Sequence, residues 1–393
     1  MKTEQQNVSE EDLVAVTGRN TRSKTSSNSV EPLPVDLIVE ICSRLPAKSM
    51  SRCRCVSKLW ASSLCLPYFT ELFLTRSLAR PNLLFACRKN KHVFFFSSPQ
   101  PQNLDDNNSS SPLAASYLMK IPYYATLFER CTSVRGLMFL GDDRILMGKE
   151  HNVSVICNPS TGKSLPLPKI KLKTSKGTGT MSYLGSEEHQ VLTLGTREPS
   201  WKVIKCCIPY HLYHEYNHVC IDGVLYYPAF RTFSSQCIIV LFDLKSEKFR
   251  FFEDTNSDCS HLINYNGKLA SRGSHQWNNN RLNGSCTSIK LRVLQDFEKH
   301  EWSEHIYQLP AFWSNTVGSF TSLRVVGVTL TNEIVFSFSY IEKPFYVFYY
   351  NAERNTIRRV QGLEAFECYS ILYTFLDHVG DVSVKLKEGS SSS

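Results

Sequence analysis

The chain has 393 residues, of which 42% are apolar, and its 44 basic and 36 acidic residues give a net charge of +8. This length and composition predict a globular protein with room for more than one domain. The charge is mild and forms no dense basic stripe, so nucleic acid is not expected as a partner.

Neither a membrane span nor a secretory signal is recognisable in the sequence. No apolar run approaches the roughly 18 residues that a membrane span needs, and the polar start "MKTEQQNVSEEDL" lacks the apolar segment of a secretory signal. We therefore expect no membrane association and a location in the cytosol or nucleus. In that reducing environment the 14 cysteines are expected mainly as small buried residues.

Polar composition predicts disorder at both ends of the chain. Residues 1–30 and 386–393 carry too few apolar side chains to form a core, so we expect two disordered tails. The polar stretch "SPQPQNLDDNNSSSP" at 98–112 is expected to be a long surface loop.

The first ordered part is expected to be helical. In residues 33–45 the apolar side chains recur at the spacing of one helix face, at Leu37, Ile38, Ile41, Cys42 and Leu45. Pro34 is tolerated in the first turn, and Pro46 interrupts the helix. A second helix is expected over about 48–59 and a short third one around 68–74. A block of about 45 residues is marginal as an isolated domain, so it needs a partner surface.

The motif "CRC" in this block invites a metal-site interpretation, but its spacing argues against one. Cys53 and Cys55 are two residues apart on the expected second helix, so their side chains point about 200° apart. They cannot bind one ion together, and Cys53 is expected to point into the core. The chain also contains no CxxC pair, the usual mark of zinc and thioredoxin-like sites.

From Pro81 onward the sequence is typical of many short strands, because aromatic and β-branched residues come in short runs broken by Gly, Asn, Asp and Pro. One element recurs, made of an apolar run, a turn with Asn or Asp and a polar return strand: "VSVICNPSTGKSLPLP" (153–168), "IIVLFDLKSEKFRFF" (238–252), "LRVLQDFEKHEWSEHI" (291–306) and "FYVFYYNAERNTIRRV" (345–360). Another strand precedes each copy, at "RGLMFL" (135–140), "DGVLYY" (222–227), "NGKLA" (266–270) and "NEIVF" (332–336). The segments "HQVLTLG" and "WKVIKCC" within 189–207 predict a further strand pair.

The spacing of these repeats predicts a β-propeller. The turn residues Asn158, Asp243, Asp296 and Asn351 are 85, 53 and 55 residues apart, and the first gap is wide enough for two units. A period of roughly 40–55 residues with several strands per unit suits propeller blades. Residues 81–385 have room for about six blades, with a large β-sandwich as the alternative. The expected fold class is therefore α+β multidomain, a small three-helix module followed by an all-β domain.

Motifs that suggest chemistry have simpler explanations here. "GKS" at 162–164 lacks the earlier glycine and the following helix of a phosphate loop, so it is interpreted as a hairpin turn. "HLYHEYNH" at 211–218 follows Pro209 and precedes a strand pattern, which favours a polar connection over a metal site. The lysine-rich "KIKLKTSKGTG" at 169–179 is expected to be a solvated loop. No nucleophile elbow or dinucleotide motif is found, so no catalytic residue, metal or cofactor is predicted.

Residues 31–77 closely resemble an F-box, in particular the plant version. The matching positions run in order through Leu33-Pro34, Asp36-Leu37, Glu40-Ile41, Arg44-Leu45-Pro46, Lys48-Ser49, Arg52, Arg54-Cys55-Val56-Ser57-Lys58, Trp60, Pro67, Phe69 and Leu74 to Ser77. Cys42, Met50 and Cys53 depart mildly from the pattern but keep the face apolar. The region 81–375 is similar to the F-box-associated domain of type 3, through "VICNPSTGKSLPLP", "DGVLYY", "LFDLKSEKFRF" and "FYVFYYN".

These resemblances imply a docking function. An F-box implies binding to a Skp-family adaptor, which connects it to a cullin-based ubiquitin ligase, while the C-terminal domain captures a protein substrate. The ligase chemistry then belongs to other subunits, and no catalytic residue is expected in this chain. By position, the residues expected at or directly behind the adaptor surface are Leu33, Pro34, Leu37, Ile41, Leu45, Pro46, Met50, Val56 and Trp60. Trp60 is equally compatible with the core of the module.

Two other functions are compatible with the same sequence. The first is a β-propeller enzyme, which needs carboxylates or histidines converging in a central funnel. The second is a binding module that associates with the adaptor without driving ubiquitination. The sequence does not identify the substrate, because propeller loops vary freely and carry the specificity.

Overall fold

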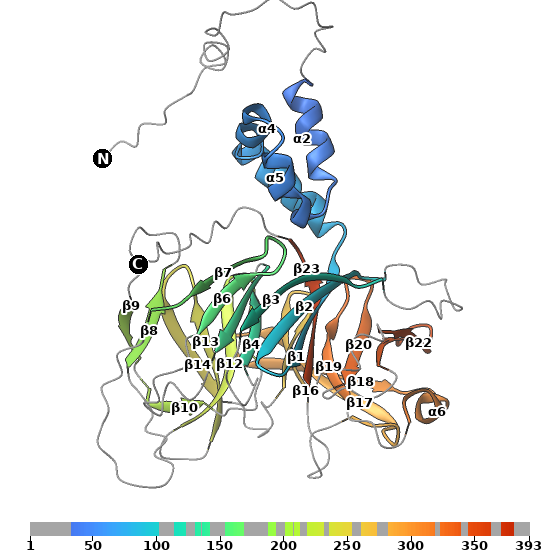
Figure 1. Ribbon diagram of the computed structural model, residues 1–393. Coiled ribbons are helices and arrows are strands. Elements are labelled where there is room, and N and C mark those ends of the chain that lie inside the picture. Colours follow the sequence, from blue (N-terminus) through green and yellow to red (C-terminus); the bar gives the residue numbers. More distant parts are fainter. Residues whose placement is uncertain are drawn as a thin grey trace, which may run out of the picture.

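The computed structural model describes residues 33–101, 114–122, 130–134, 136–141, 154–168, 188–193, 201–206, 208–212, 218–231, 236–253, 261–272, 282–318, 323–338, 345–362 and 371–380. A small helical module stands on one side of a larger ring of β-sheets (Figure 1). The two expected tails, most of the polar stretch 98–112 and the lysine-rich stretch 169–179 lie outside the described residues. None of the described helices is long and apolar enough to cross a membrane.

The helical module contains α2 (Val35–Ser43), the short 3₁₀ helix η2 (Ala47–Ser49), α3 (Met50–Arg54), α4 (Lys58–Ser63) and α5 (Pro67–Leu78). The helix expected over 48–59 is therefore split. The break lies at Ser57, whose backbone is extended and whose side-chain oxygen accepts a hydrogen bond from the Trp60 N–H, as an N-cap does. The third helix is longer than expected and begins with Pro67 in its first turn.

The module has its own core. Ile38, Val39 and Cys42 point inward from α2 and meet buried residues of the other helices: Met50, Cys53, Leu64, Phe69 and Phe73. Cys53 is buried and Cys55 exposed, which confirms the expected inward orientation of Cys53. Burial of such side chains stabilises a small module, but a core of this size contributes only a few kcal/mol.

Among the described residues, the β-domain contains five blades of four or five strands. Blade 1 has the strand order β23 (Ile371–His378), β1 (Asn82–Lys89), β2 (His92–Pro99), β3 (Ser116–Pro122). Blade 2 contains β4 (Arg130–Val134), β5 (Leu137–Gly141), β6 (Val155–Asn158) and β7 (Lys163–Pro166). Blade 3 contains β10 (Tyr210–Leu212), β11 (Val219–Ile221), β12 (Val224–Arg231), β13 (Cys237–Asp243) and β14 (Lys248–Glu253).

Blade 4 contains β15 (Leu262–Tyr265), β16 (Lys268–Arg272), β17 (Ser288–Asp296) and β18 (Glu301–Gln308). A short helix, α6 (Trp313–Val317), connects it to blade 5, which contains β19 (Leu323–Val328), β20 (Glu333–Phe338), β21 (Tyr346–Asn351) and β22 (Thr356–Gln361). Neighbouring strands pair antiparallel in every blade. The structure confirms the predicted β-propeller and not the alternative of a large β-sandwich.

The recurring sequence element forms the same structure in four blades. It is the hairpin formed by the last two strands of each of these blades, and its turn residue accepts backbone N–H groups through the side-chain oxygen. Asn158 binds the Thr161 N–H at 3.1 Å and Asn351 binds the Arg354 N–H at 2.9 Å, and Asp243 and Asp296 act in the same way. Such Asx turns are specified by local sequence, which is why the repeat could be recognised from the amino-acid sequence. The "GKS" segment lies in one of these hairpins, as expected.

The ring closes at five blades among the described residues, where the repeat spacing predicted about six. The inner strands β4, β11, β15, β19 and β23 contact one another in that order. The wide gap between Asn158 and Asp243 contains a two-stranded sheet instead, formed by β8 (Glu188–Leu192) and β9 (Trp201–Lys205). Val191 and Ile204 of this pair pack on the core side chains of blade 3. The pair therefore covers the face of a blade and adds no inner strand to the ring.

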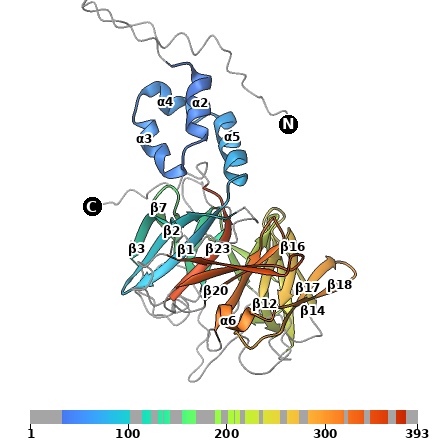
Figure 2. The ribbon, with the colours of Figure 1, turned by 90° about the vertical axis from the view of Figure 1, so that its right-hand side faces the viewer.

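Blade 1 joins the two ends of the β-domain. Its inner strand β23 pairs with β1, so that Leu84 lies opposite Phe375 and Phe85 opposite Thr374. The helix α5 leads into β1 through only a few residues, which places the helical module directly above blade 1 in both views (Figures 1 and 2). Blades 3 and 4 lie across the ring from the module (Figure 2).

Candidate functional site

The helical module exposes an apolar stripe on α2. Leu33, Leu37 and Ile41 are 42%, 50% and 44% exposed. Leu37 and Ile41 are four residues apart on one side of α2, and Leu33 lies just before the helix begins at Val35, whereas the neighbouring Ile38 is fully buried. Exposed apolar side chains that gather on one side of a module are typical of protein interfaces, so this stripe is the candidate site.

The structure places the remaining expected site residues at different depths. Pro34, Pro46 and Val56 are exposed, Val56 by 62%. Leu45 and Trp60 are half-buried and pack against the core of the module. Met50 is buried within that core. Pro34, Pro46 and Val56 are therefore open to a partner, whereas Met50 lies behind the exposed surface of the module.

An ion-pair cluster that sequence reasoning missed holds this stripe in place. Arg76 of α5 contacts Glu40 of α2 at 2.7 Å, and Arg44 contacts the other oxygen of the same carboxylate. Arg76 also hydrogen-bonds the Glu40 carbonyl oxygen and the Ser43 hydroxyl. These hydrogen bonds from Arg76 and Arg44 lower the pKa of the Glu40 carboxyl. Arg76 thus fixes α2 on α5, and only the Glu40–Arg44 spacing of four was a sequence signal for it.

Contacts with blade 1 and with the residues after its strand β23 fix the orientation of the module. The Lys48 ammonium donates to the Tyr117 carbonyl oxygen of β3 at 2.8 Å and lies over the Tyr117 ring. Ala47 sits so close to Gly380 that a Cβ on Gly380 would lie 2.8 Å from the Ala47 Cβ. Glycine is therefore required at this position for the module to approach the ring.

A serine and a histidine meet beneath this junction. The Ser160 hydroxyl lies 3.1 Å from His378 Nε2, a pairing that nucleophilic enzymes also use. Both side chains are buried, at 6% and 4% exposure, and the Ser160 hydroxyl lies beside Gly380 under η2. This burial keeps a substrate from the hydroxyl, so the pair serves to hold the β6–β7 turn on β23.

Metal binding finds no support in the part of the chain that the structure describes. No group of three or more His, Cys, Asp or Glu side chains is arranged there to hold an ion. In "HLYHEYNH", residues 213–217 lie outside the described residues, while 211–212 belong to β10. The histidine-rich segment therefore stays a predicted polar connection.

Comparison with known proteins places both domains. Residues 31–72 match the F-box domain, and residues 82–379 match the F-box associated beta propeller domain. F-box protein At5g65850 of Arabidopsis thaliana is 46% identical over 410 residues, which cover 98% of this chain and 99% of that protein. F-box protein DOR of the same organism is 49% identical over 379 residues, covering 90% of this chain and 94% of that protein.

A solved structure reported in a study of two prolyl endopeptidases matches with a TM-score of 0.34 and 11% identity, over 78% of this chain and 53% of that one. A likeness at this level carries no argument about function. The F-box and propeller matches, by contrast, span nearly all of the described chain, and the exposed stripe on α2 lies within the first of them. The chain belongs to the family of F-box proteins that carry an F-box-associated β-propeller domain.

Proposed function

We propose that this chain is the substrate-recognition subunit of a Skp–cullin–F-box ubiquitin ligase. Its F-box docks on a Skp-family adaptor and, through it, on a cullin, while the propeller captures a protein for ubiquitination. The chain is a non-catalytic subunit that uses no cofactor and acts in the cytosol or nucleus. The observation that carries the proposal is the exposed apolar stripe of an F-box, formed by Leu37 and Ile41 on α2 and by Leu33 just before that helix.

The geometry of the module supports docking by helix packing. Its core is complete without the stripe, so these side chains are available to a partner helix. Burying these three aliphatic side chains contributes a favourable binding free energy of about 25 cal/mol for each Å² of apolar area removed from water. The Arg76–Glu40 contact holds α2 in place before binding, which lowers the entropy cost of association.

The test is a binding measurement between the purified full-length chain and a purified Skp-family adaptor. Leu37→Asp is expected to weaken binding about a hundredfold or more, because burial of an unpaired carboxylate costs several kcal/mol. Leu330→Asp is the matched control, since Leu330 is 79% exposed in the β19–β20 turn. It should bind the adaptor as the wild type does.

Circular dichroism must first show that both variants are folded. A folded wild-type chain that does not bind the adaptor would contradict the docking function. Equal binding by wild type and Leu37→Asp would instead mean that the adaptor uses another surface of the module.

A further inference from the structure

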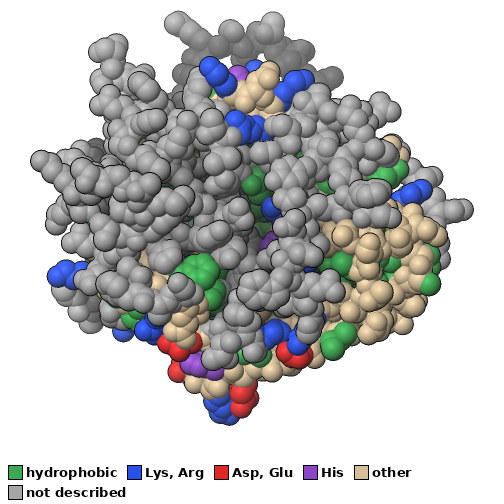
Figure 3. All heavy atoms as spheres, turned by 90° about the horizontal axis from the view of Figure 1, so that it is seen from below, with side chains coloured by type: hydrophobic (Ala, Val, Ile, Leu, Met, Phe, Trp, Pro, Cys, Tyr) green, Lys and Arg blue, Asp and Glu red, His purple; other side chains and the backbone are tan. Residues whose placement is uncertain are grey.

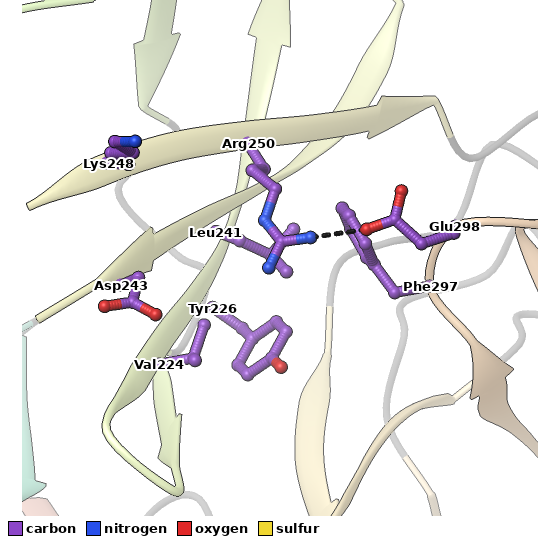
Figure 4. A pocket seen from close by; sticks show the side chains of 8 residues that line it. All are labelled: Val224, Tyr226, Leu241, Asp243, Lys248, Arg250, Phe297 and Glu298. Carbon is purple, nitrogen blue, oxygen red and sulfur yellow. Dashed lines mark hydrogen bonds and ion pairs between the residues drawn. The ribbon is translucent and has the colours of Figure 1, made fainter. Parts of the chain in front are cut away.

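A pocket opens between blades 3 and 4 (Figure 4). Its volume is about 290 Å³, and its lining residues are Val224, Tyr226, Leu241, Asp243, Lys248, Arg250, Phe297 and Glu298. The first six come from β12, β13 and β14, and the last two from the turn between β17 and β18. We call it the blade 3–4 pocket. It is not part of the F-box surface described above.

The pocket has an apolar centre and charged ends. Tyr226 and Leu241 lie opposite each other on neighbouring strands, as do Val224 and Asp243. In Figure 4, Asp243 and Lys248 stand at one end, and the Arg250–Glu298 ion pair stands at the other. The apolar side chains between them form a wall suited to an apolar group.

The size of the pocket limits what it can hold. Drug-sized ligands and cofactors occupy pockets of about 300–1,000 Å³, so a cavity of about 290 Å³ is at the lower end of that range. One aliphatic or aromatic side chain of a bound protein fits it better than a cofactor does. Hot spots of protein interfaces are often such single anchoring side chains in a small pocket.

Charge complementarity around the mouth favours an acidic segment. The Asp243 carboxylate accepts hydrogen bonds from the Lys245 and Ser246 N–H groups of its own turn, and Glu247 pairs with Lys202. Lys245 and Lys248 are both exposed, and neither makes an ion pair with any described residue. Lys248 therefore adds an exposed ammonium group to the wall of the pocket, and Lys245 adds a second one to the same turn.

The Arg250–Glu298 pair provides a third contact for an acidic group. The Arg250 guanidinium lies 4.8 Å from the Phe297 ring centre and 2.6 Å from the Glu298 carboxylate. The Glu298 side chain is 78% exposed, so its ion pair with Arg250 is weak in water. A carboxylate of a bound segment can replace it at little cost and complete the contact from the other end.

The pocket also faces the side of the ring that the F-box occupies. It lies beside the turn between β13 and β14 of blade 3. The equivalent turn of blade 2 contains Ser160, which lies under the F-box helix η2 next to Gly380. On the opposite face, seen from below, the described side chains include both charge signs and separate apolar side chains (Figure 3).

We propose that the blade 3–4 pocket receives one apolar side chain from an acidic segment of the captured protein. The apolar side chain contacts Tyr226, Leu241 and Phe297, and neighbouring carboxylates contact Lys245, Lys248 and Arg250. This inference rests on the proposed function, and it assigns a place and a chemistry to substrate capture.

The test is a selection of short random displayed peptides on the purified full-length chain, followed by affinity measurements on the selected peptides. Peptides that pair an apolar residue with Asp or Glu should be enriched. Lys248→Glu should weaken their binding about tenfold, because it turns an attraction into a repulsion. Val224→Phe should weaken it similarly by filling the pocket. Lys205→Glu, an exposed lysine of β9, is the charge-matched control and should leave binding unchanged.

Three results would overturn the inference: no enriched peptides, enriched peptides rich in Lys or Arg, or peptides that bind wild type and Lys248→Glu equally. Adaptor binding is measured on the same protein samples. If the adaptor binds but the peptides do not, only the pocket assignment fails. If the wild-type chain does not bind the adaptor, the proposed function fails, whatever the peptides do.

Discussion

The F-box and the propeller differ in how completely they bury their large apolar side chains. More than half of the exposed large apolar side chains among the described residues belong to residues 33–78, although the propeller is several times longer. The propeller packs its blades face to face, so that Met138 and Leu140 of blade 2 join Leu84 and Phe95 of blade 1 in one core. Both domains therefore have a buried core, but the small F-box leaves a larger share of its apolar side chains exposed to solvent.

The largest effects should come from matched deletions in the two cores. Phe73 of the F-box and Phe336 of blade 5 are both buried, and Phe→Ala at each costs about 3–5 kcal/mol. The F-box has only a few kcal/mol in total, so Phe73→Ala should unfold it and abolish adaptor binding. Phe336→Ala should lower the melting temperature of the propeller and leave adaptor binding unchanged.

Circular dichroism and adaptor affinity, measured on both variants, check this pair. If Phe73→Ala binds the adaptor with normal affinity, the F-box is more stable on its own than its small core implies. Loss of adaptor binding in Phe336→Ala would show instead that the two domains unfold together.

Acid should destabilise the propeller more than the F-box. Burial lowers the pKa of His378 to about 4 and that of His261 to about 3, from the usual 6.5, and the F-box segment 31–77 contains no histidine. The unfolded chain takes up these protons near pH 6.5 and the folded propeller does not. The contribution of these neutral histidines to the free energy of unfolding is therefore fully present above pH 6.5. It is lost as the pH falls toward 4, by roughly 3 kcal/mol for His378.

Thermal melts at several pH values between 7 and 4 test this expectation. His378→Gln should flatten the acid dependence of the propeller transition, whereas His92→Gln, at the half-exposed start of β2, should not. An acid transition in which the F-box melts before the propeller would contradict the expected order of unfolding.

The smallest effect concerns the junction between the domains. Lys48→Met removes the hydrogen bond to the Tyr117 carbonyl oxygen, worth about 1 kcal/mol. We expect unchanged adaptor affinity and melting temperature but a wider distribution of domain orientations, measured by small-angle scattering. Lys58→Met, an exposed site on α4, is the control. A scattering profile identical to that of the wild type would mean that Gly380 and Ala47 fix the orientation without Lys48.

Local signals made much of this fold predictable. The Asx turns at Asn158, Asp243, Asp296 and Asn351 depend on one side chain and the N–H groups that follow it, so the four hairpins and the strands before them were predicted at the right places. The strand pair within 189–207 was also predicted correctly. The inward Cys53 followed from helix geometry alone.

Long-range packing decided what the sequence did not reveal. Five blades instead of six result from how β8 and β9 pack on blade 3, and no local pattern encodes that contact. The split at Ser57 is an exception, because a serine three residues before Trp60 was a visible capping signal. The Arg76–Glu40 contact joins residues 36 apart, and the blade 3–4 pocket needs two blades in place, so neither was accessible to pattern reasoning.

The pairing of β23 with β1 has a consequence for the newly made protein. A ribosome releases the F-box and β1 early, but the strand that completes blade 1 is among the last segments to emerge. Until then β1 has one unpaired edge and the ring stays open, whereas the F-box can already fold. Under the proposed function, docking is thus available before substrate capture, and a chain cut short before Ile371 would occupy adaptor molecules without offering them a closed propeller.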